Sequence, residues 1–91
     1  MRATKIKMKL GCMYSNSVLE IDEIYISGCS NPGWFKKSII YDYLVKYPNS
    51  IQVNKYPYPN LIPAKSYNGE KYVKSNPNNS EMDNLLNLPR E

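Results

Sequence analysis

Residues 34–47, WFKKSIIYDYLVKY, carry the pattern that decides the fold. Apolar side chains recur there at positions 35, 39, 40, 43, 44 and 47, which is the spacing of one buried helix face. Asn31 and Pro32 come just before and predict a helix start, with Asn31 as the N-cap. Lys46 suits the negative end of the helix dipole, and Pro48 predicts the stop. We therefore expect one main helix over residues 34–47.

Two strands are predicted before this helix. Residues 5–10 alternate lysine with apolar side chains, so Ile6, Met8 and Leu10 would share one face. Residues 18–27 predict a second strand. The side of the strand that carries its apolar residues changes at Asp22-Glu23, which indicates a bulge or a break in the strand.

Three shorter signals follow the helix. Ile51 and Val53 alternate with polar residues and predict a short strand, whereas the prolines of residues 56–60 predict a loop or an edge. Asn68-Gly69 predicts a two-residue type I′ hairpin. In that register one hairpin face carries Lys65, Tyr67, Tyr72 and Lys74, and the inward face carries Ile62, Ala64 and Val73.

This order of elements predicts an α+β fold with a small antiparallel sheet and one main helix packed on one of its faces. The chain has 91 residues, so we expect a single domain over 1–91, with a sheet-and-helix body in 1–74. The helix would leave the opposite sheet face, bearing lysine and tyrosine, open to solvent or to a ligand.

The end of the chain, residues 75–91, joins a polar spacer to the leucine-rich segment DNLLNLP. Asp83 is a predicted N-cap for one helical turn over residues 84–88, from which Leu85 and Leu88 project together. Each buried leucine contributes roughly 1.5–3 kcal/mol, so we expect the tail to act as a latch. The sequence leaves open whether it closes on its own sheet or docks on a neighbouring copy, which would make a homo-oligomer.

Three segments, GWFKKSIIYDYLVKYPNSIQV (33–53), GEKYVKSNPNN (69–79) and DNLLNLP (83–89), occur here in one order. Together they resemble a widespread family of small proteins of unknown function from Gram-positive bacteria and their phages, which ends in a DNL-x-x-LP signature. The resemblance covers about residues 24–90, and residues 1–23 carry none of it. It implies a compact sheet-and-helix domain, often phage-borne. Some phage proteins of this size sequester nucleotide immune signals, and we extend that role to this chain as an expectation.

The composition argues against catalysis. The sequence contains no histidine, which excludes a His-based triad, a histidine general base and a histidine metal ligand, and no Gly-rich phosphate loop of the Walker type is present. Cys12 and Cys29 have the spacing of neither a redox CxxC pair nor a four-ligand zinc site, and a disulfide between them stays open. The acids Glu20, Asp22 and Glu23 are interpreted as a solvated strand face. We expect a non-enzymatic protein without a cofactor or a metal.

The net charge of +4 favours an anionic partner. The N-terminal residues alternate lysine with apolar side chains and contain no apolar run long enough for a signal core or a membrane span. We therefore expect a soluble, cytoplasmic protein with no membrane partner.

Two groups of side chains predict an anion site. Residues 30–33 lead into the predicted helix, whose first turns carry Lys36 and Lys37, so free N–H groups, the helix dipole and two ammonium groups would form a phosphate seat beside Trp34. The second group is the hairpin face, which Tyr56 and Tyr58 would extend. The predicted ligand-binding residues are Trp34, Lys36, Lys37, Lys65, Tyr67, Tyr72 and Lys74. Lys5, Lys7 and Lys9 would lengthen the hairpin group if the first strand lies beside it.

Three functions remain open at this point. The first is sequestration of a small anionic nucleotide of the cyclic-nucleotide type, with lysines on the phosphates and a ring stacked on the base. The second is an accessory protein that binds RNA or DNA through the same face. The third is a protein–protein inhibitor of a host factor, with tyrosines as interface anchors.

Overall fold

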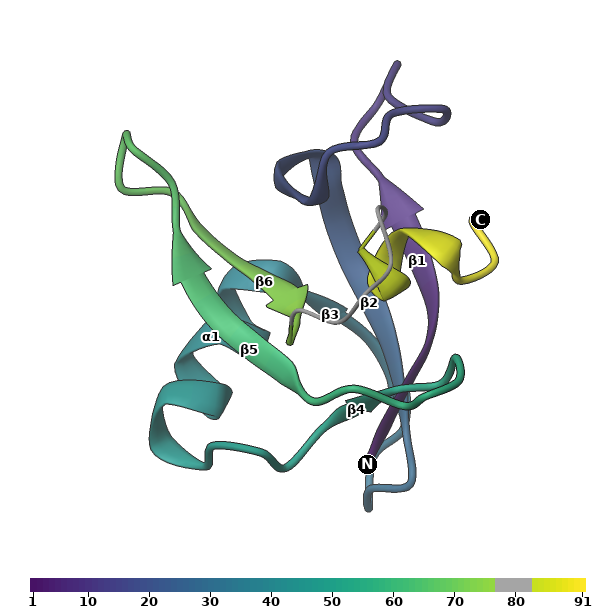
Figure 1. Cartoon of the computed structure of the whole chain (residues 1–91), viewed down its shortest axis with the longest axis vertical. Coiled ribbons are helices and arrows are strands. Elements are labelled where there is room, and N and C mark those ends of the chain that lie inside the picture. Colours follow the sequence, from purple (N-terminus) through teal and green to yellow (C-terminus); the bar gives the residue numbers. More distant parts are fainter. Residues whose placement is uncertain (77–82) are drawn as a thin grey trace.

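The computed structural model describes residues 1–76 and 83–91 (Figure 1). The remaining residues, 77–82, form most of the predicted spacer and lie outside the described part. The elements are β1 (Arg2–Met8), η1 (Val18–Glu20), β2 (Ile21–Ser27), β3 (Gly33–Lys36), α1 (Lys37–Lys46), β4 (Gln52–Val53), β5 (Leu61–Lys65), β6 (Lys71–Ser75) and η2 (Asn84–Asn87). The predicted α+β class is confirmed.

The strands form two sheets instead of one. A four-stranded sheet has the order β3-β2-β1-β4, and β5 pairs with β6 in a separate hairpin. The larger sheet is mixed, because β1 runs antiparallel to β2 but parallel to β4. Between β1 and its parallel neighbour β4 the chain passes through β2, β3 and α1, which supplies the long connection that parallel neighbours need.

The main helix begins three residues later than predicted. Trp34 pairs with Tyr25, and Phe35 pairs with Ile24, so this segment is the edge strand β3. Lys36 occupies the N-cap position and makes no side-chain capping bond. The predicted cap at Asn31 is therefore wrong. A short apolar run fits a strand as well as a helix, and the free edge of β2 decides between the two.

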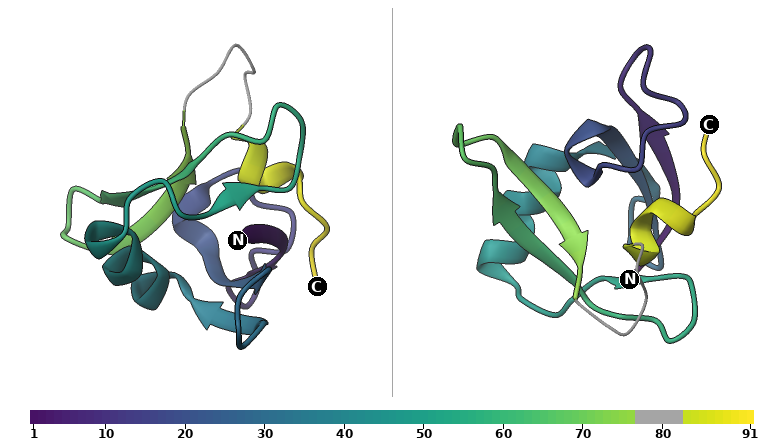
Figure 2. Two further views of the ribbon diagram at one scale, coloured as in Figure 1. Left: turned by 90° about the horizontal axis from the view of Figure 1, so that it is seen from below. Right: turned by 45° about the horizontal axis from the view of Figure 1, so that its top comes forward.

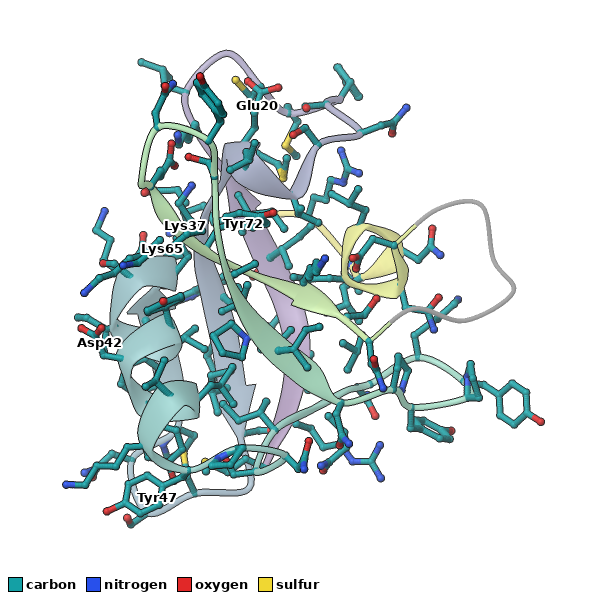
Figure 3. All side chains as sticks on the ribbon, turned by 60° about the vertical axis from the view of Figure 1, so that its left-hand side comes forward. Glu20, Lys37, Asp42, Tyr47, Lys65 and Tyr72 are labelled. Atoms are coloured by element: carbon teal, nitrogen blue, oxygen red, sulfur yellow. The ribbon has the colours of Figure 1, made fainter. Side chains whose placement is uncertain are left out.

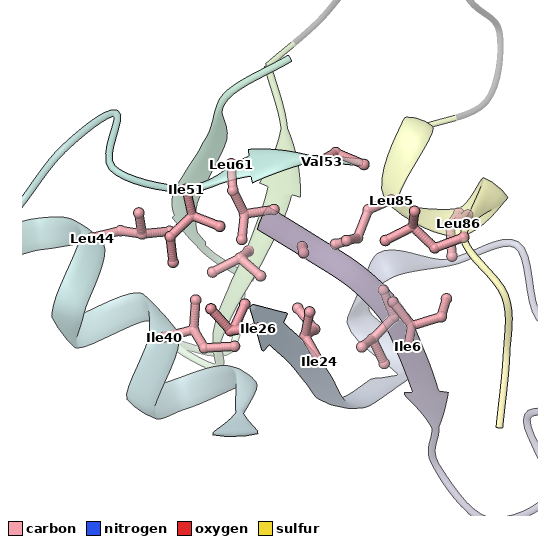
Figure 4. Packing of buried hydrophobic residues seen from close by; sticks show 14 of the residues in the cluster. Ile6, Ile24, Ile26, Ile40, Leu44, Ile51, Val53, Leu61, Leu85 and Leu86 are labelled. Atoms are coloured by element: carbon pink, nitrogen blue, oxygen red, sulfur yellow. The ribbon is translucent and has the colours of Figure 1, made fainter. Parts of the chain in front are cut away.

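The hydrophobic core lies between the inner face of the larger sheet and three elements that pack on it, namely α1, the β5–β6 hairpin and η2 (Figures 2 and 4). Its buried members are Ala3, Ile6, Met8, Ile21, Ile24, Ile26, Ile40, Leu44, Ile51, Val53, Leu61, Val73, Leu85, Leu86 and Leu88. Leu10, predicted to face inward, is fully exposed because β1 ends at Met8. The predicted irregularity at Asp22 is confirmed as a register shift between β1 and β2.

The hairpin register differs from the prediction by one residue. Lys65 pairs with Lys71, and Ala64 pairs with Tyr72. The turn is longer than a two-residue loop: Gly69 N–H donates to the Ser66 carbonyl at 2.9 Å, and Gly69 has a φ of 83°, which favours glycine. A one-residue shift moves side chains to the opposite face. Lys65 therefore shares a face with Lys71, whereas Tyr72 shares the other face with Ala64.

In the structure of the single chain, the C-terminal segment packs on the core of its own chain. Leu85, Leu86 and Leu88 are buried in the core, and the Asp83 carboxylate accepts from Leu85 N–H at 2.9 Å as the predicted N-cap. The next residues continue as a strand-like edge of the sheet. Ile6 N–H donates to the Pro89 carbonyl at 2.9 Å, and Glu91 N–H donates to the Ile6 carbonyl at 3.0 Å.

One ion cluster joins the hairpin to the sheet. Lys37 is only 9% exposed, and its ammonium group donates to the Leu19 carbonyl at 2.6 Å and to Glu70. Lys9 donates to the same carboxylate at 3.1 Å. The hydrogen bonds from Lys37 and then from Lys9 hold the pKa of Glu70 below its usual value.

This cluster makes stability depend on pH. A carboxyl group whose pKa is lowered by folding stabilises the fold above its unfolded pKa of 4.5, and that contribution is lost as the pH falls through the lower, folded value. As the pH falls below about 5, we expect the free energy of unfolding to decrease more steeply in the wild type than in Glu70→Gln. Urea denaturation at each pH measures this, with the exposed Glu91→Gln as the control. Equal slopes for Glu70→Gln and the wild type would contradict the assignment.

Candidate nucleic-acid interface

The outer face of the larger sheet is the surface on which aromatic and basic side chains meet. Strand alternation places Ile6, Ile24 and Phe35 in one cross-strand row toward the core. The neighbouring row, Lys5, Tyr25 and Trp34, therefore points outward. We call this surface the open face, and its side chains are Arg2, Lys5, Lys7, Glu23, Tyr25, Trp34 and Lys36.

An aromatic pair forms the centre of the open face. The rings of Tyr25 and Trp34 are 5.5 Å apart in an edge-to-face arrangement. The Lys5 ammonium lies 4.8 Å from the Tyr25 ring centre, and the Lys7 ammonium lies 4.7 Å from that of Trp34. Such a contact contributes about 0.5–1 kcal/mol at an exposed site, whereas stacking of a nucleobase contributes about 1–3 kcal/mol. A base can therefore displace either ammonium group from its ring.

Each lysine of the open face also has a carboxylate partner. Lys7 lies 3.9 Å from Glu23, Lys5 lies 3.4 Å from Glu91, and Lys36 lies 3.3 Å from Asp22. Exposed pairs of this kind contribute about 0–1 kcal/mol, so each lysine can exchange its carboxylate for a phosphate at little cost. The same carboxylates lower the positive potential of the face.

The predicted phosphate seat is not formed. The helix starts after Lys36, so residues 30–33 do not lead into its N-terminus, and the Lys37 ammonium is committed to Glu70 and the Leu19 carbonyl. Trp34 and Lys36 belong to the open face instead. Ser30 and Asn31 lie at an apolar cavity of about 280 Å³ on the inner side of the sheet, which Phe35 and Ile40 also line.

The predicted hairpin cluster is divided. Lys65 lies on the opposite hairpin face from Tyr72 and Lys74, because of the register shift. Tyr67 is fully exposed at the hairpin tip. The hairpin belongs to a separate sheet, so the stripe of Lys5 and Lys7 does not continue into it. Of Lys5, Lys7 and Lys9, only Lys9 contacts the hairpin, where its ammonium group donates to the Glu70 carboxylate.

The three acids considered for catalysis point to separate partners. Glu20, which lies at the opposite end of the molecule from Tyr47 (Figure 3), accepts hydrogen bonds from Cys12 and Ser15, and these bonds lower its pKa. The same bond to Glu20 raises the pKa of the Cys12 thiol, so the thiol stays protonated and is a poor nucleophile. Asp22 and Glu23 bind different lysines.

Both cysteines are free thiols, and Cys29 lines the apolar cavity. Within residues 1–76 and 83–91, no group of three potential ligands lies close enough to hold a metal ion. Among the same residues, no helix is long and apolar enough to cross a membrane.

Tyr25 is the aromatic residue of the open face that sequence reasoning missed. Its segment, IDEIYIS, predicts a strand but does not show which strands lie on either side of it. Only the pairing of β2 with both β1 and β3 places Lys5 and Trp34 beside it.

A comparison with protein families identifies the class of this chain. Residues 4–89 match the model of a family described as a protein of unknown function, DUF3892. The chain belongs to this family. The matched region includes residues 4–8 of β1, although the sequence resemblance was expected to begin near residue 24. Searches of curated proteins and of solved structures each gave no match.

Proposed function

We propose that this protein binds single-stranded nucleic acid on the open face and does not act on it chemically. The observation that carries the proposal is the Tyr25–Trp34 pair, whose rings lie 5.5 Å apart with an ammonium group over each. Sheet surfaces that bind single strands use ring planes to stack bases and cations to neutralise phosphates.

The shape of the open face favours a strand over a small nucleotide. Small-molecule sites are concave and bury about 70–90% of a drug-sized ligand. The open face is the solvent side of a sheet, and the apolar cavity on the inner side has no lysine or arginine among its lining residues. A strand needs no enclosure, because it sums several modest contacts along its length. The cyclic-nucleotide sponge is therefore the weaker proposal, and the setting in a Gram-positive bacterium or its phage rests on the DNL-x-x-LP resemblance alone.

Trp34 makes the proposal directly testable, because it is the only tryptophan of the chain. We expect a single-stranded oligonucleotide of about 12 nucleotides to quench its fluorescence, since a base would stack on the ring. The logarithm of the association constant should fall linearly with the logarithm of the salt concentration, with a slope of about −0.7 for each neutralised phosphate. Quenching by a cyclic dinucleotide but not by the single strand would favour sequestration of a cyclic nucleotide instead. No quenching by either ligand would refute nucleotide recognition on this face.

Matched variants locate the site. Lys7→Ala should reduce the salt slope by about 0.7. Lys65 is an exposed lysine of the hairpin, so Lys65→Ala should leave the slope unchanged. Glu23→Gln removes the carboxylate that lies 3.9 Å from the Lys7 ammonium, and we expect it to strengthen binding. A weaker complex with Glu23→Gln would contradict an anionic ligand.

A further inference from the structure

The open face continues past the edge of the sheet through an aromatic loop. Arg2 pairs with Ser27 and with Gln52, and the alternation along β2 places Ser27 on the same side as Tyr25. Arg2 is therefore an outward residue. Its guanidinium group lies 4.6 Å from the centre of the Tyr58 ring, in the loop that follows β4.

This loop presents two rings to solvent. Tyr56 is 81% exposed and Tyr58 is 47% exposed, and their rings are 6.1 Å apart in an edge-to-face arrangement. Like the Tyr25–Trp34 pair, they are two adjacent aromatic rings beside basic side chains. Neither ring fills the core, so packing does not account for them.

The backbone holds Tyr58 in an uncommon conformation. Its φ is 60°, in the left-handed region that a bulky residue rarely adopts. The turn is fixed by hydrogen bonds from Tyr58 N–H to the Lys55 carbonyl at 2.8 Å and from Val53 N–H to the Pro59 carbonyl at 2.9 Å. Non-glycine residues in this region cost about 1–3 kcal/mol and cluster at functional sites. Here the conformation presents the ring to Arg2.

From these observations we infer that Tyr56 and Tyr58 form a second stacking platform, so that one strand crosses β3, β2, β1 and β4 in turn. This inference rests on the proposed function and adds the direction and length of the site. The bases would stack on Tyr25 and Trp34 at one end and on Tyr56 and Tyr58 at the other. Arg2, Lys5 and Lys7 all belong to β1, between the two platforms, where they would meet the connecting phosphates.

The sheet sets the length of this path. Neighbouring strands lie about 4.8 Å apart, so the path from β3 to β4 is roughly 14 Å. At a stacked repeat of about 3.4 Å per nucleotide, this corresponds to about four nucleotides. A ligand much shorter than that reaches one platform only.

An oligothymidylate length series with the full chain tests the inference. Trp34 fluorescence should report affinity that rises steeply up to about four nucleotides and only slowly beyond that length. In a variant with Tyr56→Ala and Tyr58→Asn, we expect the tetramer to bind about 5- to 150-fold more weakly for each lost stacked base, while the dimer binds as in the wild type. Asparagine is chosen for position 58 because it tolerates a positive φ.

The controls separate two kinds of failure. Tyr67→Ala, at the exposed hairpin tip, should leave the length series unchanged. If no oligomer quenches Trp34 in the wild type, the proposed function itself fails. If the oligomers quench but the double variant shows the wild-type length dependence, the second platform is refuted and the first stands.

Discussion

Replacing Leu85 with alanine is expected to lower the free energy of unfolding by about 3–5 kcal/mol. Leu85 has no exposed surface and packs in the same core as Ile6 and Val53 (Figure 4). The loss combines the transfer free energy of the removed atoms with a cavity that the surrounding strands cannot fill. A domain of this size has a total stability of about 5–13 kcal/mol, so the variant should unfold at a much lower urea concentration.

Leu10→Ala is the matched control for this experiment. Leu10 is fully exposed, so the same substitution there should change stability by no more than about 0.5 kcal/mol. Light scattering of both variants over a range of protein concentrations tests whether copies exchange their latches, since exchange would make the oligomeric state depend on Leu85. If Leu85→Ala changed neither stability nor oligomeric state, the latch would have no structural role.

Asp83→Ala should lower the free energy of unfolding by about 2–4 kcal/mol, the second-largest effect, because this carboxylate accepts hydrogen bonds from two elements. It accepts from Leu85 N–H at 2.9 Å as the cap of η2, and from the Ser75 hydroxyl and N–H at 2.7 and 3.1 Å at the end of β6. Ser75 is buried, so its donors would be left without partners. We expect the melting temperature to fall by roughly 10 °C or more, at about 4–8 °C per kcal/mol for a domain of this size.

Asp42→Ala supplies the comparison. Asp42 makes a 2.8 Å ion pair with Lys71, but its side chain is 62% exposed, so its loss should cost no more than about 1 kcal/mol. In a double-mutant cycle, Asp83→Ala and Ser75→Ala should be less than additive, since each removes the same bonds. Additive effects would show that the Ser75–Asp83 contact does not join the latch to β6.

The candidate site was predicted only in part. Trp34 and Lys36 were assigned to a ligand site and do lie on the open face, although on a strand and not at a helix N-terminus. Lys37 is committed to the Glu70 cluster, and Lys65, Tyr67, Tyr72 and Lys74 belong to the separate hairpin. A preference for an aromatic and basic sheet surface followed from composition, but the members of that surface depend on strand neighbours that no local pattern specifies.

The sequence by itself determined the elements whose signal is local. The alternation in residues 5–10, the helical spacing in residues 34–47 and the DNLLNLP segment are local signals, so they predict β1, α1 and the latch, although not their exact ends. Such signals depend only on the side-chain periods of strands and helices.

Only the tertiary structure decided which strands and side chains are neighbours. Gly33–Lys36 became a strand because the edge of β2 offered unpaired backbone groups, and the hairpin register shifted by one residue because of its turn. The open face exists because Lys5, Tyr25 and Trp34, from three different strands, meet in one cross-strand row. This row depends on pairing between strands that are distant in the sequence, and such pairing leaves no periodic pattern along the chain.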